Sequence, residues 1–511
     1  MIILSSFSIN YYVSSNGVYP VDAFLHYDSG FRILLGELPI RDYWIVHGLL
    51  IDYIQAFFFK IFGNNWQSYI IHSSLFNVLI SLFSFKVFDA LNLKTHQSVI
   101  LSILIGFLAY PVSGTPFLDL HASYFSLFAI YLIIFSIIKN KKIYWFLASF
   151  FLCFAFFSKQ VPSAYTIVGI TALCAFFSFT DKGRGKNIFV FYILGAIIFL
   201  TIFLFLLLLL EIPLEDFIIQ LFLFPKSFGL NRYADYALGF ENIIADYKFI
   251  HVIFIPIIII NLIKIKKENS YILKKDFQIF LVIFVFTIST IIHQIYTKNQ
   301  IYIFFLIPIL SGFLIYFLNN IKIKNKIFLI NSVLLISIIV TIKYNERFNL
   351  DRKFHELIYT NLSNATSASK IDKKLSGLNW VSPYFENPNE EIDNIKKFLK
   401  ILKKDKENKI VITDYNFVSS ILNQKLFSPS RTYDTISFPK KNEKFYKNYK
   451  SFFIKNIKKN NINNIYMLYP YKIKNELIEL IVYNYISANC FDKKIIDDYI
   501  LILKISDCPE L

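Results

Sequence analysis

The sequence predicts an α-helical, polytopic membrane protein of about 10–11 spans with a soluble α/β domain at its C-terminal end. Three observations predict this class. Hydrophobic residues make up 55% of the 511 positions and charged residues only 17%, and the mean hydropathy of +0.49 is too high for a soluble globule. Many apolar runs approach the ~20 residues that a helix needs to cross a bilayer. After about residue 345 these runs give way to strand-like and amphipathic segments.

Residues 1–65 are predicted to form an outer loop with two surface helices. The segment 22–36 begins at Asp22, a plausible N-cap, repeats apolar side chains at helical spacing and reaches Gly36, which can stop a helix. The segment 48–63 is short and is interrupted by polar side chains. Neither segment resembles a span, so we expect both to lie at the membrane surface.

Residues 66–345 are predicted to form the transmembrane domain. Ten apolar runs are predicted to be spans: 66–88, 97–112, 122–138, 143–158, 164–180, 187–210, 249–265, 277–293, 300–318 and 327–342.

The net charge of +17 follows the membrane topology rather than indicating nucleic acid as a partner. Lysine and arginine gather in every second loop, around residues 86–94, 139–142, 182–186, 264–275 and 322–326. By the positive-inside rule these loops are cytoplasmic. We therefore expect a multi-pass protein of the inner (cell) membrane, with residues 1–65 and the C-terminal domain on the extracytoplasmic (periplasmic) side.

Residues 346–511 are predicted to be a soluble α/β domain. The segments 408–415, 463–471 and 498–506 have the pattern of buried strands, and 389–404 that of an amphipathic helix. Cys490 and Cys508 lie in this domain without the spacing of a zinc site. In an oxidising compartment they are predicted to form a disulfide around the last strand, the alternative being two unrelated cysteines.

The stretch VDAFLHYDSGFRILLGELPIRDYWIVHGLLIDYIQAFFFKIFG resembles the first outer loop of the GT-C glycosyltransferases. It is most similar to the bacterial relatives of the protein O-mannosyltransferases and of the lipid A aminoarabinose transferases. The shared elements are the acidic Asp22, then Gly36, Pro39 and Asp42, and a closing FFFKIFG helix. The resemblance covers residues 20 to about 165 and, weakly, 300–312.

The resemblance implies an inverting transfer of a sugar from a polyprenyl-phosphate donor to a glycan, lipid or protein acceptor on the outer face. It implies that no cofactor is required, with a divalent metal possible. Asp22 matches the catalytic carboxylate and is the expected general base, the alternative being a helix N-cap. The family has a full span before this residue, whereas about 13 apolar-leaning residues precede Ser14 here. We therefore expect an incomplete first helix or an upstream start.

Further acidic and histidine side chains are candidates for the same site. His26 and Asp28 lie on neighbouring turns, where we expect a solvated helix face, with a place in the same site as the alternative. Asp42 is expected to order the loop or contact the acceptor. Asp119 and His121 are expected just outside the span that begins near residue 122, where the superfamily often has a second acidic residue. Capping of that helix is the alternative for Asp119. With Glu37, these two residues are weak metal-ligand candidates.

Cationic and polar side chains at the outer helix ends are candidates for binding the donor phosphate. They are Lys159, Gln160, His293 and Lys298. Lys159 departs from the positive-inside trend, which favours a phosphate partner, with interfacial snorkelling as the alternative.

Three other functions compete with the transferase. A transporter or flippase of lipid-linked glycans predicts charges near the middle of spans and inverted repeats, neither of which is evident in the sequence. A non-catalytic membrane anchor for the C-terminal domain predicts a first loop without the acidic pattern. A glycan polymerase or O-antigen ligase predicts Arg and His in a large late loop, whereas the largest loop, 211–248, has only Lys226 and Arg232 as strong cations.

Overall fold

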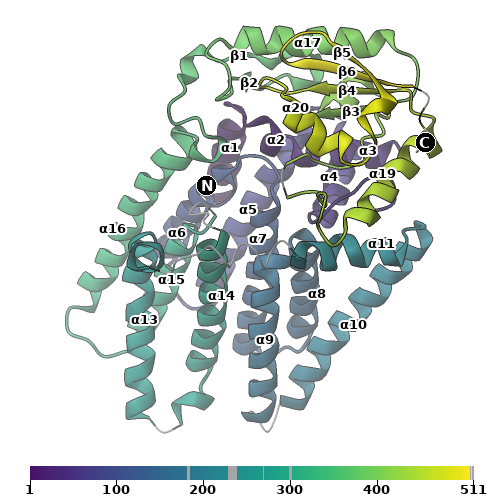
Figure 1. Ribbon diagram of the computed structural model, residues 1–511. Coiled ribbons are helices and arrows are strands. Elements are labelled where there is room, and N and C mark those ends of the chain that lie inside the picture. Colours follow the sequence, from purple (N-terminus) through teal and green to yellow (C-terminus); the bar gives the residue numbers. More distant parts are fainter. Residues whose placement is uncertain are drawn as a thin grey trace.

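The computed structural model describes residues 1–180, 185–227, 239–268, 270–297, 302–434, 436–506 and 508. A bundle of long helices forms most of the molecule, and a smaller α/β domain covers one end of that bundle (Figure 1). The prediction of a polytopic helical membrane protein with a C-terminal domain is confirmed.

The chain begins with a short helix that packs into the bundle. This helix, α1 (Ile2–Ser14), lies against α5 (Trp66–Ala90) and α6 (Thr95–Leu108). Its contacts are polar: Ser6 Oγ donates to Ser81 Oγ at 2.8 Å, and Asn10 Nδ2 donates to Ser73 Oγ at 3.0 Å. These hydrogen bonds satisfy the hydroxyl of Ser6 and the amide nitrogen of Asn10, both of which α1 buries at the contact.

Three short helices follow before the first long one: α2 (Pro20–Ala23), α3 (Leu25–Leu34) and α4 (Leu49–Phe62). They correspond to the two predicted surface helices, with the first broken at Phe24. The predicted N-cap was wrong, because Tyr19 caps α2 and Asp22 lies inside it. Pro20 occupies the first turn, where its fixed φ suits a helix and its missing N–H costs nothing. Gly36 follows the end of α3 with φ +81°, a backbone conformation that favours glycine.

All ten predicted spans contain a helix in the structure. Besides α5 and α6, they are α7 (Leu118–Lys139), α8 (Ile143–Ser158), α9 (Gln160–Thr180), α10 (Gly185–Leu209), α13 (Lys248–Lys267), α14 (Lys275–Thr297), α15 (Leu306–Asn319) and α16 (Lys326–Asn345). Among the described residues, 8 helices are long and apolar enough to cross a membrane, and α8 and α15 are shorter apolar helices. The sequence predicts Asp119 and His121 just outside this span. That placement was wrong, because α7 begins at Leu118 and both residues lie in its first turn.

The C-terminal domain contains a four-stranded sheet in the order β3-β4-β6-β5. The parallel pair β3 and β4 is followed by β6 and β5, both antiparallel to their neighbours. Helix α17 (Pro388–Lys404) covers the side of the sheet away from the bundle, and α19 (Tyr446–Asn460) lies on the side toward it (Figure 1). The strands are β3 (Lys409–Thr413), β4 (Asn464–Leu468), β5 (Phe491–Ile495) and β6 (Ile500–Ile505), and the short elements of the domain are β1 (Thr366–Ser367), β2 (Asn379–Trp380), α18 (Val418–Leu422) and α20 (Asn475–Ile478).

The predicted strands 408–415, 463–471 and 498–506 contain β3, β4 and β6, and the predicted helix is α17. A disulfide joins Cys490 and Cys508, the pair that the sequence predicted.

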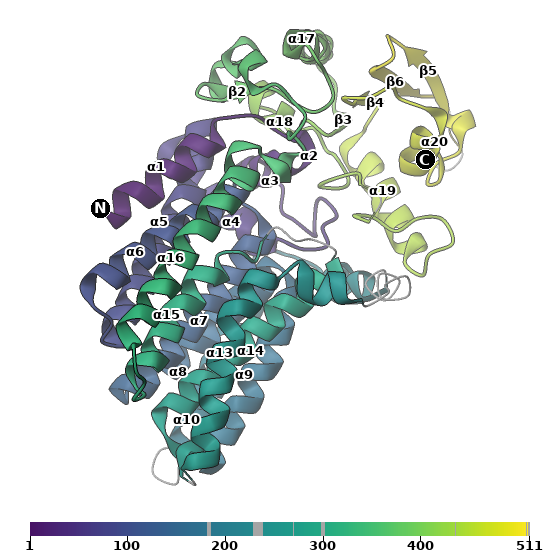
Figure 2. The same ribbon diagram turned by 90° about the vertical axis from the view of Figure 1, so that its left-hand side faces the viewer.

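The N-terminal helices α2–α4 lie between the bundle and the C-terminal domain (Figure 2). Phe24 packs among Trp66, Trp380 and Phe417, with ring centroids 4.7–6.0 Å apart. The backbone is joined as well, since Trp44 N donates to Pro429 O at 2.8 Å and Arg431 N donates to Trp44 O at 3.1 Å. The first loop and the C-terminal domain therefore share one buried core.

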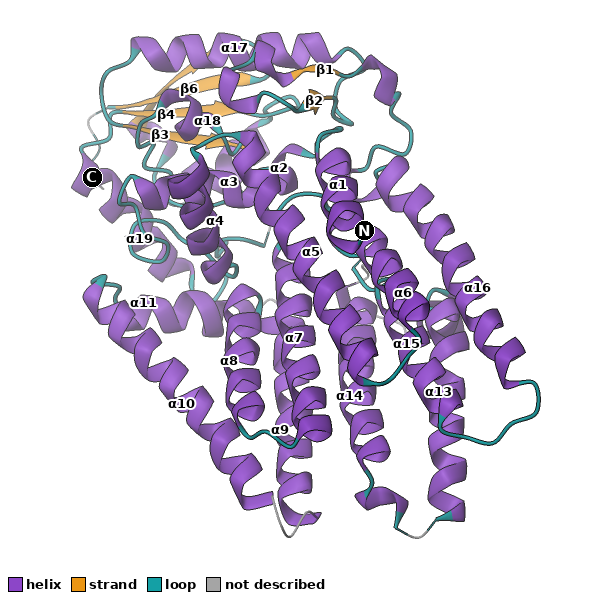
Figure 3. Cartoon of the chain, turned by 180° about the vertical axis from the view of Figure 1, so that it is seen from behind, coloured by secondary structure: helices purple, strands orange, loops and turns teal. Residues whose placement is uncertain are grey.

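The lysine-rich loops lie at the end of the bundle away from the C-terminal domain (Figure 3). These are the connections α5–α6, α7–α8, α13–α14 and α15–α16, whereas the predicted cytoplasmic cations Lys182 and Arg184 lie outside the described residues. The alternation of charge in the sequence therefore corresponds to two opposite ends of the molecule.

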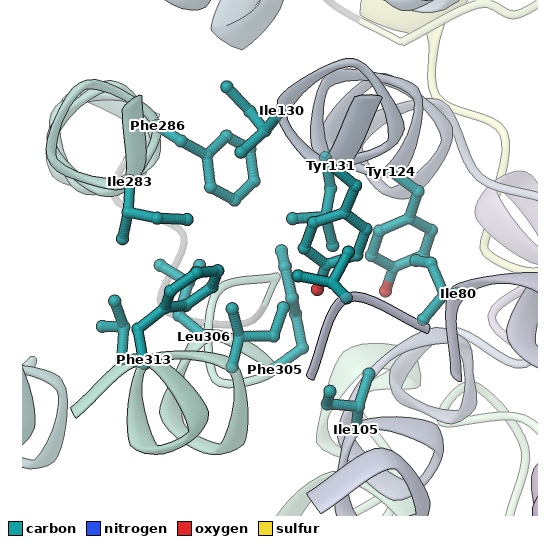
Figure 4. Packing of buried hydrophobic residues seen from close by; sticks show 14 of the residues in the cluster. Ile80, Ile105, Tyr124, Ile130, Tyr131, Ile283, Phe286, Phe305, Leu306 and Phe313 are labelled. Atoms are coloured by element: carbon teal, nitrogen blue, oxygen red, sulfur yellow. The ribbon is translucent and has the colours of Figure 1, made fainter. Parts of the chain in front are cut away.

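The core of the bundle is aromatic and branched aliphatic (Figure 4). Side chains from α5, α6, α7, α14 and α15 meet there, and Tyr131 of α7 is satisfied by a 2.8 Å hydrogen bond with Ser84. Helix α7 is the centre of this core, because 89% of its most apolar 18-residue stretch is buried. The corresponding share for α10 is 22%. The exposed face of α10 is therefore available to lipid.

Candidate active site

A cavity of about 670 Å³ lies where the bundle, the first loop and the C-terminal domain meet. Asp22 of α2 lines it from the first loop, Asp119 and Lys159 line it from the ends of α7 and α8, and Asp434 lines it from the C-terminal domain. Three candidate residues far apart in the sequence therefore face one cavity. Further lining comes from His47, Tyr302, Lys353, Phe354, Glu356 and Thr432.

Asp22 is held in position by the packing of its own short helix. Two residues later Phe24 is fully buried among aromatic rings, which fixes the orientation of α2. Burial, the neighbouring carboxylates of Asp434 and Asp119, and Glu356 raise the pKa of Asp22 to about 7, while Lys159 opposes this shift. A carboxyl group with a pKa near the working pH is suited to accept a proton and release it again.

Asp119 is held by two basic side chains. Both of its carboxylate oxygens lie within 2.8 Å of Lys159 Nζ, and Oδ1 also lies 2.9 Å from His293 Nε2. Asp119 and His293 are buried, and the Lys159 side chain is 19% exposed toward the cavity. The structure thus brings together three predicted residues, from α7, α14 and the residue that ends α8. Lys159 already pairs with Asp119, so a phosphate bound beside Lys159 would also lie near the carboxylate of Asp119.

The other predicted residues near the first loop lie outside this cavity. The predicted solvated face for His26 and Asp28 was wrong, because both side chains are largely buried under the C-terminal domain. Asp28 accepts a hydrogen bond from Ser419 of the C-terminal domain, and its pKa is raised by burial. Asp42 forms ion pairs with Arg41 at 2.7 Å and Lys459 at 3.2 Å, and these interactions outweigh burial and lower its pKa.

The remaining predicted polar residues make contacts of their own. Gln160 Nε2 donates to the carbonyl oxygens of Val46 at 2.9 Å and Leu221 at 2.8 Å. His121 lies 3.0 Å from His72 (Nε2 to Nε2) and contacts Tyr110, away from the cavity. Lys298 lies outside the described residues.

The weak metal-ligand candidates are not gathered into one site. Glu37 pairs with Arg32 at 3.3 Å, whereas Asp119 pairs with Lys159 and His121 faces His72. Within the part of the chain that the structure describes, no group of three or more His, Cys, Asp or Glu side chains is arranged to hold a metal.

A buried charge network connects the cavity to the C-terminal domain. Arg431 Nη1 lies 3.1 Å from Asp52 Oδ2, and Asp52 Oδ1 accepts from His26 Nδ1 at 2.7 Å. Arg431 Nη2 also donates to His47 Nδ1 at 2.8 Å. Burial and the nearby Arg431 and Lys159 hold the pKa of His47 well below its usual range, so His47 faces the cavity as a neutral imidazole. A Cβ atom at position 48 would lie only 2.9 Å from atoms of both Arg431 and His26, so glycine is needed at this position.

The sequence did not indicate the part of the site that comes from the C-terminal domain. Asp434 lines the cavity, and Asp414, just after β3, has its pKa raised to about 7 by burial and by the charges of Asp434 and Asp22. No periodicity or motif connects these residues to Asp22. His47 lies within the motif stretch. The glycine that follows it, Gly48, was the one feature of the sequence that could have pointed to His47 as a site residue.

Comparison with known proteins agrees with the resemblance seen in the sequence. The family model described as dolichyl-phosphate-mannose-protein mannosyltransferase matches residues 46–208. These residues run from α4 almost to the end of α10 and include Asp52, Asp119 and Lys159. A search of the curated proteins found no match. The predicted resemblance to the mannosyltransferase type of GT-C enzyme is confirmed over this region.

Proposed function

We propose that this chain, a membrane glycosyltransferase of the GT-C type, moves a sugar from a polyprenyl-phosphate donor to a hydroxyl group of a glycan, lipid or protein acceptor. The observation that carries this proposal is the shared cavity of Asp22 and Lys159 at one end of the helix bundle. A lipid-linked donor fits such a cavity, because its tail needs the bilayer and its sugar needs the aqueous side. Charged and apolar side chains both line the cavity, which lies at the ends of α7 and α8.

In the proposed reaction Asp22 is the general base. Its carboxylate takes the proton of the acceptor hydroxyl as the oxygen attacks the anomeric carbon of the donor. The new carbon–oxygen bond forms as the bond from the anomeric carbon to the phosphate oxygen breaks, and the polyprenyl phosphate leaves with the electron pair. Because this is a single displacement, the configuration at the anomeric carbon inverts.

The leaving phosphate needs positive charge or hydrogen-bond donors. We assign this role to the Lys159 end of the cavity, with Lys353 nearby in the lining. Asp119 and His293 hold Lys159 in position through the contacts described above. No metal takes part in this proposal, in keeping with the paired state of the candidate ligands.

We place the reaction on the extracytoplasmic side of the inner membrane. The support is the position of the lysine-rich loops at the end opposite the cavity, combined with the positive-inside rule. A flippase has no comparable support, because the Asp119 cluster lies near helix ends and not in the middle of spans.

Transfer of radiolabelled mannose from polyprenyl-phosphate mannose, measured in membrane vesicles, tests the proposal, with further monosaccharides of the same donor class assayed in parallel. We expect Asp22→Asn to lower the rate by ~10²-fold or more, the usual contribution of a general base. Asp28→Asn is the matched control, since it removes the same charge nearby but outside the cavity. Full activity of the Asp22 variant with any active donor would refute the role of Asp22.

A further inference from the structure

The loops that leave the parallel strands β3 and β4 bring polar and aromatic side chains to one edge of the sheet. Asp414 directly follows β3, and Tyr469 and Tyr471 follow β4. The two strands end side by side, because Thr413 pairs with Leu468 in the parallel register. Ligands of open α/β sheets bind outside the carboxyl ends of parallel strands. This edge is therefore the expected ligand-binding edge of the C-terminal domain.

Three tyrosines form a row from this edge to the first loop. The rings of Tyr19 and Tyr384 stack with their centroids 5.6 Å apart, and the centroids of Tyr384 and Tyr471 lie 6.1 Å apart. Tyr19 caps α2, and its carbonyl oxygen accepts a hydrogen bond from Asp22 N at 3.1 Å. Tyr471 is 40% exposed at the other end of the row, and the other two rings are half-buried. The tyrosine row therefore leads from the helix that carries Asp22 to the surface of the C-terminal domain.

Carboxylates lie along the tyrosine row. Asp414 is 8% exposed and interacts with the hydroxyl of Tyr471. Burial raises the pKa of Tyr19, and the charges of Glu356, Asp22 and Asp414 add to this shift, whereas the hydroxyl of Tyr384 opposes it. The three carboxylates therefore lie near the inner end of the row. At its outer end Lys472 follows Tyr471 in the chain, but this lysine pairs with Asp498 at 3.0 Å.

A buried hydroxyl at the same edge has no partner. Burial raises the pKa of Tyr469 well above its usual range, and the charge of Asp414 adds to this shift, so Asp414 lies near its hydroxyl. Among the residues that the structure describes, this hydroxyl has no hydrogen-bond partner. Buried polar groups are normally paired, so the edge has hydrogen-bonding capacity that a ligand or its bound water can complete.

Aromatic rings beside carboxylates are suited to bind neutral saccharides. The C–H faces of a sugar ring pack on aromatic rings, and its hydroxyls donate charge-assisted hydrogen bonds to carboxylates. An acidic saccharide would bring like charges together at the same place, which costs binding free energy. A peptide that adds to a sheet is held by main-chain hydrogen bonds along an edge strand, whereas this row offers side chains at strand ends.

We propose that the tyrosine row and Asp414 bind the acceptor, and that the acceptor is the end of a neutral saccharide chain. This inference rests on the proposed function, because the row begins beside the proposed base Asp22. The last sugar of the chain presents a hydroxyl to Asp22. Its proton passes to that carboxylate, its oxygen bonds to the anomeric carbon of the donor, and the polyprenyl phosphate leaves. The preceding sugars lie along the row toward Tyr471.

Binding of oligosaccharides to the full-length chain in nanodiscs, without donor, tests this proposal. The probe is a printed panel of neutral hexose and N-acetylhexosamine oligosaccharides, with uronate-containing oligosaccharides and serine- or threonine-rich peptides beside them. We expect the neutral oligosaccharides to bind. The Kd of the tightest of them should rise by ~10-fold or more in Tyr384→Leu/Tyr471→Leu, which removes both rings but keeps apolar bulk. Tyr471→Leu alone, at the exposed end of the row, should raise the Kd by about threefold.

Two variants serve as controls. Tyr384→Phe/Tyr471→Phe keeps both rings and should bind close to the wild-type value. Tyr483→Leu removes another half-buried tyrosine of the domain, whose ring lies 5.9 Å from that of Phe491 in β5, and should also bind like the wild type. Equal Kd values for the Leu and Phe double variants or an equal loss in the Tyr483 variant overturns the proposal. A panel in which peptides or acidic oligosaccharides bind as tightly as neutral ones, or in which no neutral one binds, overturns it as well.

Transfer kinetics separate a failure of this inference from a failure of the proposed function. With the bound oligosaccharide as acceptor, Tyr384→Leu/Tyr471→Leu should raise the KM for the acceptor and leave kcat nearly unchanged, whereas Asp22→Asn should lower kcat. A wild-type protein that transfers sugar only to peptides would overturn this inference and leave the proposed function intact. Full transfer by the Asp22 variant would refute the proposed base, whatever the panel shows.

Discussion

Replacing Arg431 with Met should destabilise the contact between the C-terminal domain and the first loop. Asp52 is fully buried and Arg431 is 3% exposed, so the substitution leaves a buried carboxylate whose remaining polar partner is His26. Removing one partner of a buried ion pair costs about 3–5 kcal/mol. For a domain of this size, ~1 kcal/mol corresponds to a Tm shift of roughly 2–4 °C. We therefore expect the Tm of the purified protein to fall by at least ~6 °C.

Differential scanning fluorimetry in detergent measures this shift, and a double-mutant cycle identifies its cause. Adding Asp52→Asn to Arg431→Met should restore a large part of the loss, because the amide removes the uncompensated charge. The control Lys472→Met breaks the ion pair with Asp498, whose two side chains are 66% and 61% exposed, and should change stability by less than ~1 kcal/mol. Additive losses in the Asp52–Arg431 cycle, or equal shifts in the control, would refute the reasoning.

Two further predictions concern the cavity. Lys159→Met should lower both the Tm and the transfer rate, because it leaves Asp119 buried without its lysine. Adding Asp119→Asn should recover the Tm but not the transfer rate. If the double variant recovers the transfer rate as well, Lys159 acts only as a structural partner. Treatment with EDTA should leave the transfer rate unchanged, since the candidate ligands Glu37, Asp119 and His121 are engaged elsewhere; a loss that Mg²⁺ or Mn²⁺ restores would contradict the metal-free mechanism.

The membrane part of the fold was predictable because the bilayer imposes simple rules on the sequence. A span needs a long apolar run, so segments such as 187–210 are evident without any knowledge of packing. Helix ends were less accurate: α7 begins four residues before the predicted 122, because polar Asp119 and His121 are satisfied inside the bundle by Lys159, His293 and His72. Hydropathy alone does not anticipate such pairing.

The C-terminal domain was predicted only where its segments are buried. The strands β3, β4 and β6 have apolar sequences, whereas β5 was missed because four of its five residues are exposed at the edge of the sheet. Helix α19 was missed because lysine and asparagine dominate its sequence, YKNYKSFFIKNIKKN, and hide a narrow apolar side.

The candidate site was half predictable. Asp22 and Lys159, which line one cavity, were predicted from the motif resemblance and from the departure of Lys159 from the charge pattern of the loops. Asp434 and Arg431 were not, because they reach the site through tertiary contacts with residues almost 400 positions earlier in the chain. Such contacts leave no periodicity or spacing in a single sequence.

The most direct test of a base at Asp22 is the pH dependence of kcat/KM for transfer. The base must be ionised to accept the proton, so the rate should rise with pH and reach half its maximum near the Asp22 pKa of about 7. Because the charge of Asp434 helps to raise that pKa, Asp434→Asn should move the midpoint to lower pH. A profile that is flat between pH 5.5 and 8.5, or one that does not move in the Asp434 variant, would contradict the account.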